Sequence, residues 1–184
     1  MSNLTNWLED KFSFLSIPSK YGTSPPHVSA TSPVEAERVA WAKLATLREG
    51  GRLIVYLDSL NKPTVGRGHL VTAGDGLRVG DHITQAQSDA FWAKDGADAF
   101  DHAIALSAQA GITSADFLPY LASVCYQLGD AWTRKFPNTW AMICDGDYAK
   151  AADALDGTVW DEQTPTRVQD FAGALRRLPP KVKA

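Results

Sequence analysis

From Glu49 to Leu70 the chain reads EGGRLIVYLDSLNKPTVGRGHL, and the interpretation of the other segments depends on this stretch. Two glycines directly after Glu49 predict the end of a helix, which places this carboxylate in the last helical turn. The run of β-forming residues from Leu53 to Leu57 predicts a strand that Asp58 ends. Asn61 then predicts a turn, after which a second short strand is broken by two glycines.

The spacing of Glu49, Asp58 and Thr64 suits carbohydrate chemistry. The two acids lie nine positions apart with glycines and a strand between them, so they cannot share a helix face. The helix would leave Glu49 on one wall of a concavity, and the hairpin would return Asp58 and Thr64 to face it. A glycosidase needs a proton donor at the leaving oxygen and a second group that positions water or attacks the sugar. The negative end of the helix dipole should raise the pKa of Glu49, which favours it as the donor.

The whole string resembles the phage-type lysozymes, the T-even phage class of glycoside hydrolase family 24. Their signature is Glu, eight residues, Asp, five residues, Thr, then Gly-x-Gly-His, and it aligns here without a gap. Two later segments, Tyr126–Asn138 and Trp160–Arg167, also resemble the family, so that the resemblance covers residues 33 to about 178. The matching signature residues are Glu49, Arg52, Tyr56, Asp58, Thr64, Gly66, Gly68 and His69.

This resemblance implies an α+β fold of the lysozyme type that is mostly helical. We expect an N-terminal extension and linker at 1–31 and a phage-type lysozyme domain at 32–184. Within the domain, the resemblance implies a small lobe with a short antiparallel sheet at about 48–83. A long connecting helix at about 84–108 should join it to a larger all-helical lobe at about 109–178.

Local patterns predict where individual helices lie. Thr84 with Gln87 three residues later predicts an N-terminal capping box for the long helix. Gly96, in the middle of that helix, is interpreted either as a flexing point or as a site of close packing. The segment from Val71 to Asp81 should complete the small sheet. A helix before Glu49 is predicted by the capping box Ser32-Pro33-Val34-Glu35 and by an apolar stripe of Ala36, Ala40, Leu44 and Leu47.

The function implied by the resemblance is hydrolysis of peptidoglycan at the β-1,4 bond between N-acetylmuramic acid and N-acetylglucosamine. Glu49 would act as the general acid. Asp58 would stabilise the oxocarbenium charge and, with Thr64, hold a water on the opposite face, which gives inversion. An inverting site needs carboxyl groups roughly 6.5–9.5 Å apart, whereas a separation near 5 Å would favour a covalent intermediate on Asp58.

Further site residues follow from the same resemblance. Gln127 matches a sugar-contacting position, and Arg67 and Asn138 are expected to bind substrate with it. Arg67 departs from the family, which usually has an apolar or aromatic residue between the two glycines. In a supporting role, Arg167 should pair with Glu49, and His69 should pair with Asp95. The residues alone leave an alternative for each of three side chains. Gln127 is then a polar residue in the middle of a helix, and Arg167 is a solvated cation. His69 is then hydrogen-bonded to any backbone carbonyl.

Composition narrows the partners that the chain can have. Its 184 residues are 45% hydrophobic and 21% charged, as in an ordinary globular protein, and the net charge of −3 gives no general attraction to nucleic acid or membrane. Residues 164–184 hold five cations and one acid, which we interpret as a solvated tail or, alternatively, as a contact for an anionic polymer. We expect a monomer whose partner is bacterial peptidoglycan.

No metal or organic cofactor is expected. The chain has no Cys-x-x-Cys, no His-Glu-x-x-His and no phosphate-binding glycine loop. Cys125 and Cys144 lie in apolar runs, so we interpret them as two buried thiols, with one disulfide as the alternative.

The extension at 1–31 contains a short apolar cluster that is too charged to span a membrane and lacks the features of a signal peptide. We favour an appendage that packs loosely on the domain. The alternative is an amphipathic segment that contacts a partner or a membrane surface.

Three biological roles fit these patterns. We favour a phage endolysin that is made in the host cytoplasm and acts on the cell wall in the periplasm during lysis. A virion-associated tail lysozyme is the alternative within the enzyme class. The alternative outside it is a non-catalytic wall-binding or structural module on a lysozyme fold, which would bind glycan without releasing reducing ends.

Overall fold

The computed structural model describes residues 33–48, 51–58, 61–129 and 131–181. Every described residue belongs to one compact unit, Ser32–Ala184. The predictions for the extension at 1–31, for Ser32 and for the position of Glu49 therefore lie outside the described residues.

The described part is mostly helical with one small antiparallel sheet, which confirms the predicted α+β class. None of its helices is both long and apolar enough to cross a membrane. In chain order the elements are α2 (Pro33–Arg48), β1 (Arg52–Leu57), β2 (Pro63–Gly66), β3 (His69–Leu70), η2 (Ala73–Asp75), α3 (Gln85–Gln109), η3 (Ala115–Phe117), α4 (Leu118–Leu128), α5 (Trp132–Lys135), α6 (Pro137–Asp145), α7 (Tyr148–Asp153), α8 (Val159–Gln163) and α9 (Pro165–Arg177).

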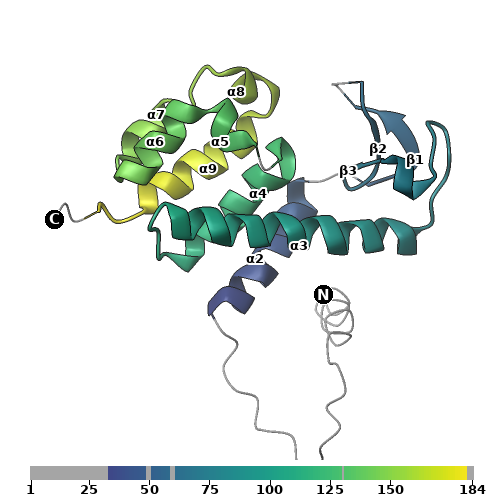
Figure 1. The fold of residues 1–184 in the computed structure, drawn as a ribbon, viewed down its shortest axis with the longest axis horizontal. Coiled ribbons are helices and arrows are strands. Elements are labelled where there is room, and N and C mark those ends of the chain that lie inside the picture. The colour runs from purple at the N-terminus through teal and green to yellow at the C-terminus, as the bar shows by residue number, and fades with distance from the viewer. Residues whose placement is uncertain (1–32, 49–50, 59–60, 130, 182–184) are drawn as a thin grey trace, which may run out of the picture. The chain divides into compact units, whose positions relative to one another are not determined.

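The long helix α3 supports the rest of this unit. It begins with the predicted capping box, in which the Gln87 N–H donates to Thr84 Oγ1 at 3.1 Å and the Thr84 N–H donates to Gln87 Oε1 at 2.8 Å. The sheet lies over the N-terminal half of α3, and α4–α9 gather around its C-terminal half (Figure 1). We call the described residues of 51–83 the sheet lobe, and α4–α9 the helical lobe.

Gly96 in the middle of α3 is a site of close packing. It is buried, and its carbonyl accepts a hydrogen bond of 3.0 Å from the indole N–H of Trp41 on α2. A Cβ at this position would lie 3.1 Å from the Trp92 ring, which is closer than ordinary van der Waals contact. The absence of a side chain at Gly96 therefore leaves room for the ring of Trp92, which stands four positions earlier on the same helix.

The sheet has the order β1-β2-β3, with Tyr56 opposite Thr64 and Thr64 opposite Leu70. Asn61, in the loop between β1 and β2, has a φ of 63°, which asparagine tolerates better than most residues. The segment after β3 adds no further named strand, because it first forms η2. It then returns to β1 and pairs with it through an antiparallel bridge between Ile54 and His82 and through hydrogen bonds of 2.9 Å from the Val55 N–H to the Asp81 carbonyl and 2.8 Å from the Ile83 N–H to the Leu53 carbonyl.

Two separate cores stabilise the lobes. The sheet lobe closes over a small cluster of Val55, Val65, Val71 and Ile83, with Leu77 and Phe91 packed against it. The larger core joins α3 to the helical lobe, and α2 contributes Trp41 and Ala45 to it.

The apolar stripe predicted for α2 was partly wrong. Its fully buried residues are Trp41 and Ala45, whereas Leu47 is 75% exposed. The helix is rotated so that the Trp41 indole reaches the Gly96 carbonyl. In the helical lobe, Leu121, Val124 and Cys125 of α4 are buried, whereas Leu128 at the end of this helix is half-buried. Both Cys125 and Cys144 are free thiols, but only Cys125 is buried as predicted, and Cys144 is half-buried.

Candidate active site

Asp58 and Thr64 lie close together at one end of the β1–β2 hairpin. The Asp58 carboxylate accepts a 2.8 Å hydrogen bond from the Lys62 N–H, while the Asp58 N–H donates to the Lys62 carbonyl at 2.9 Å. The Thr64 hydroxyl donates to the same carbonyl at 3.2 Å, and Thr64 is only 5% exposed. Lys62 thus fixes both residues through its backbone. The hairpin places a half-buried carboxylate beside a buried hydroxyl.

The end of α2 is anchored to α9. Arg48, the last residue of α2, donates from Nε and Nη2 to one carboxylate oxygen of Asp170, at 2.8 and 2.7 Å. Asp170 lies three positions after Arg167, and residues at this spacing are neighbours on one helix face. Glu49 itself lies outside the described residues, but the residue directly before it is held beside the helix that carries Arg167.

Arg167 is the third residue of α9, which begins at Pro165. Its side chain is half-buried, and its Nη1 atom is shielded from solvent. The N-terminal turn of a helix disfavours a cation because of the helix dipole, so an arginine here requires a local reason.

Gln127 on α4 holds the segment that carries Arg167. Its Oε1 accepts from the Trp160 indole N–H at 2.9 Å, and its Nε2 donates to Thr164 Oγ1 at 3.0 Å. Both partners precede Arg167 in the α8–α9 segment. The sequence predicted a substrate contact for Gln127 but missed these two bonds. Trp160 and Thr164 stand in the same motif as Arg167, which was the available signal.

His69 lies between two carboxylates. Its Nδ1 is 2.6 Å from Asp95 Oδ2, which places the predicted pair in contact, and its Nε2 is 3.3 Å from Asp75 Oδ2. Phe91 stacks on the imidazole with ring centroids 3.9 Å apart. The Thr72 N–H and hydroxyl also bind Asp75, and together with His69 they lower the pKa of that carboxyl. The role of Asp75 was not foreseen, because nothing in its local sequence points to His69.

The two other predicted substrate-binding residues, Arg67 and Asn138, differ in their exposure to solvent. The Arg67 side chain is 16% exposed, with Nη2 3.6 Å from Asp89 and the guanidinium 5.8 Å from the centre of the Trp92 ring. Asn138 is the second residue of α6 and is exposed. Asn138 therefore has the more accessible side chain of the two.

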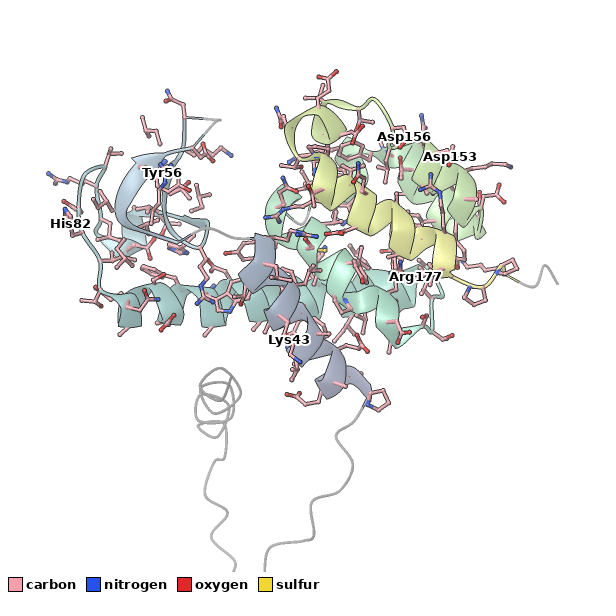
Figure 2. All side chains as sticks on the ribbon, turned by 180° about the vertical axis from the view of Figure 1, so that it is seen from behind. Lys43, Tyr56, His82, Asp153, Asp156 and Arg177 are labelled. Carbon is pink, nitrogen blue, oxygen red and sulfur yellow. The ribbon has the colours of Figure 1, made fainter. Side chains whose placement is uncertain are left out.

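Two hollows lie away from the hairpin. One of about 330 Å³ is bounded by α2, α4 and α9 and contains Glu37 and Asp116, where burial and then the nearby Asp116 charge raise the pKa of Glu37. The other, of about 290 Å³, lies against the C-terminal segment up to Lys181. In Figure 2, Tyr56 marks the sheet lobe and Arg177 marks α9 beside the first hollow. Among the described residues, no three His, Cys, Asp or Glu side chains form a group that could hold a metal.

The chain is similar to known phage sequences. A family model described as "Phage lysozyme" matches residues 47–177, which is well over half of the chain. A protein of Pseudomonas phage phiKMV, named peptidoglycan hydrolase gp36, is 28% identical over 140 residues. That match covers 76% of this chain but only 15% of the length of the phage protein.

Proposed function

The chain belongs to the phage lysozyme family, and we propose on this basis that it hydrolyses peptidoglycan. The bond would be the β-1,4 linkage between N-acetylmuramic acid and N-acetylglucosamine. The relative's name, peptidoglycan hydrolase, supports the same substrate class. The observation that carries the proposal is the hairpin, in which the Lys62 backbone binds both Asp58 and Thr64. These two residues follow Glu49 in the sequence at the spacing of the glycosidase motif.

The proposed reaction uses two carboxyl groups on opposite sides of the glycosidic bond. Glu49 gives its proton to the leaving oxygen as the bond from that oxygen to the anomeric carbon breaks. Asp58 stabilises the positive charge on the sugar and, with Thr64, orients a water on the opposite face. That water adds to the anomeric carbon and loses a proton to Asp58, which inverts the configuration. Exchange with solvent then returns a proton to Glu49 and removes one from Asp58.

The remaining residues are proposed in binding and supporting roles. Gln127, Arg67 and Asn138 would contact the glycan, and Asn138 offers the most exposed side chain. Arg167 would pair with Glu49, which the Arg48–Asp170 contact supports because it brings the end of α2 to α9. His69 and Asp95 would hold β3 on α3, since the contact between their side chains joins these two elements.

The test is release of reducing ends from purified Gram-negative peptidoglycan by the parent and by Glu49→Gln. Loss of a general acid typically costs about 100-fold or more, so the variant should fall by at least that factor. Glu35→Gln, in α2, serves as a control and should retain the parent rate. Mass analysis must find N-acetylmuramic acid at the new reducing ends, and the α anomer must appear first if the configuration inverts. Equal rates for the parent and Glu49→Gln would contradict the assignment.

For the biological role we propose an endolysin, made in the host cytoplasm and acting on the wall in the periplasm as a monomer. A virion-associated lysozyme is the alternative, in which the domain would be part of a larger particle protein. In the phage phiKMV relative the matching region is 15% of a much longer chain. Mass spectrometry of purified virions separates the two roles. An endolysin should be absent from washed particles and abundant in late-infection cytoplasm. If the protein instead binds wall without releasing reducing ends, the non-catalytic alternative holds.

A further inference from the structure

A hydrogen bond joins the helical lobe to the turn of the sheet lobe between β2 and β3. The Tyr126 hydroxyl on α4 donates to the backbone carbonyl of Arg67 at 2.7 Å, across 59 residues of sequence. Arg67 lies between Gly66, which ends β2, and His69, which begins β3. Its carbonyl therefore lies in a turn, where a donor from another element can bind it.

The turn itself has a defined position on α3. Gly66 has a φ of 63°, and a Cβ there would lie 2.8 Å from the buried Ser88 hydroxyl. On the other side of the turn, the Arg67 guanidinium lies near Asp89 and over the Trp92 ring. The turn thus rests on α3, while Tyr126 holds it from α4.

The ring that carries the hydroxyl is fixed by other aromatic side chains. The Tyr126 ring lies 5.2 Å from Trp92 and 5.9 Å from Trp41, measured between ring centroids. The Trp41 indole is bound in turn to the Gly96 carbonyl. Helices α2, α3 and α4 therefore meet at this aromatic cluster, which presents the hydroxyl in one place.

Tyr126 also stands next to the residue that organises the other side of the proposed site. Its neighbour Gln127 binds Trp160 and Thr164, just before Arg167. At the other end of the bond, β2 carries Thr64 two positions before Gly66. Tyr126 therefore contacts the turn that follows β2, while its neighbour Gln127 contacts the segment that carries Arg167.

We propose that Tyr126 is a positioning residue, whose hydroxyl holds the β2–β3 turn at a fixed place relative to the helical lobe. In this role it sets the distance between the hairpin, with Asp58 and Thr64, and the α8–α9 segment. The effect on catalysis rests on the proposed function, whereas the structural effect does not. A reaction that needs groups on both faces of one bond is sensitive to this distance.

The first test compares Tyr126→Phe with Tyr120→Phe in the full chain. Both variants lose one hydroxyl from α4, but Tyr120 lies at the hollow beside Arg177 rather than at the turn. Tyr126→Phe should lower kcat for reducing-end release about three- to tenfold, the range that one neutral hydrogen bond accounts for, with KM within about twofold. Tyr120→Phe should leave both constants unchanged. An unchanged kcat in Tyr126→Phe, or a change confined to KM, would overturn the positioning role.

The second test needs no enzymatic activity. The Gly68 nitrogen belongs to the same peptide unit as the Arg67 carbonyl, so its ¹⁵N resonance should move in Tyr126→Phe and stay in Tyr120→Phe. Residual dipolar couplings of backbone amides should also show a changed orientation of the sheet lobe relative to the helical lobe. Unchanged couplings would contradict the proposal. If the parent releases no reducing ends, the proposed function fails and these couplings alone decide the role of Tyr126.

Discussion

Arg48 and Asp170 form a contact that fixes the last turn of α2 against α9, with two guanidinium nitrogens 2.7 and 2.8 Å from one carboxylate oxygen. The two side chains are about equally shielded, at 28% and 27% exposure. The pair matters because the proposed general acid is the next residue along the chain.

Asp170→Asn should therefore reduce activity more than stability. Partly exposed ion pairs contribute about 1 kcal/mol or less, so the Tm should fall by at most about 4 °C. The rate of reducing-end release should fall about tenfold, since misplacing a reacting group by about 1 Å can cost 100-fold. Asp153→Asn, on α7, is the control because Asp153 forms a more exposed ion pair with Arg176 of α9 (Figure 2). Equal losses in the two variants would show that the Arg48 contact has no special role.

Asp75 should stabilise the protein at neutral pH. Its lowered pKa means that its contribution is present above the unfolded value of 3.8 and is lost as pH falls through the folded value. Asp75→Asn should cost about 1 kcal/mol at pH 7, as for the loss of a cap, and the cost should shrink near pH 2. Denaturant unfolding at both pH values measures this difference.

Asp81→Asn provides the comparison for Asp75→Asn. Asp81 also accepts a backbone N–H from three residues earlier, that of Arg78 at 2.8 Å. Among the residues that the structure describes, no hydroxyl or imidazole binds its carboxylate. The cost of Asp81→Asn should be smaller. An equal or larger cost would mean that the contacts of Asp75 with the Thr72 hydroxyl and His69 add no stability.

Glu37 should have the opposite pH dependence. Burial and the Asp116 charge raise its pKa above 4.5, so its ionisation disfavours the folded state as pH rises through the folded value. Glu37→Gln should raise the Tm by about 1–2 °C at pH 7 and leave it unchanged below about pH 4. Thermal unfolding across this range checks the sign. Glu35→Gln, on the same helix, should show no such gain, and a gain that persists at pH 3 would refute the electrostatic cause.

Gly96 and Gly173 offer a matched pair of glycine-to-alanine changes. A Cβ at Gly173 on α9 would make an ordinary contact of 3.5 Å with Arg177, so Gly173→Ala should gain up to about 1 kcal/mol of helix propensity. At Gly96, three atoms of the Trp92 ring would lie within 3.3 Å, and Trp41 and Tyr126 restrict how far this ring can move. Gly96→Ala should lose about 1 kcal/mol or more in unfolding free energy despite the better propensity. A stabilised Gly96→Ala would show that the Trp92 ring yields easily.

The hairpin could be predicted from sequence because its signals are local. Asn61 takes a positive φ, the two glycines mark the ends of β2 and its turn, and the strand between Leu53 and Leu57 follows from its β-forming residues. The start of α3 could be predicted for the same reason, since Thr84 and Gln87 are close in sequence and bind each other's backbone.

Features that depend on distant partners could not be read in this way. The buried face of α2 is set by where Trp41 meets Gly96, 55 residues later, and spacing alone favoured a stripe that included the exposed Leu47. The contact between Asp75 and His69 could likewise not be predicted, because the fold of η2 brings Asp75 to the imidazole. The bonds of Gln127 to Trp160 and Thr164 join segments over 30 positions apart.

The membership of α2 in the larger core has a consequence for the order in which the chain can fold. Trp41 and Ala45 precede the sheet lobe, but they belong to one core with residues of α4 and α9 that follow it. In topological terms, the sheet lobe is an insertion between two parts of one helical core. That core can close only after the ribosome has released α4, so loop-closure entropy makes the docking of α2 a late, non-local step. Deletion of α2 would consequently weaken the distant helical lobe, while the sheet next to it in sequence would keep its own small core.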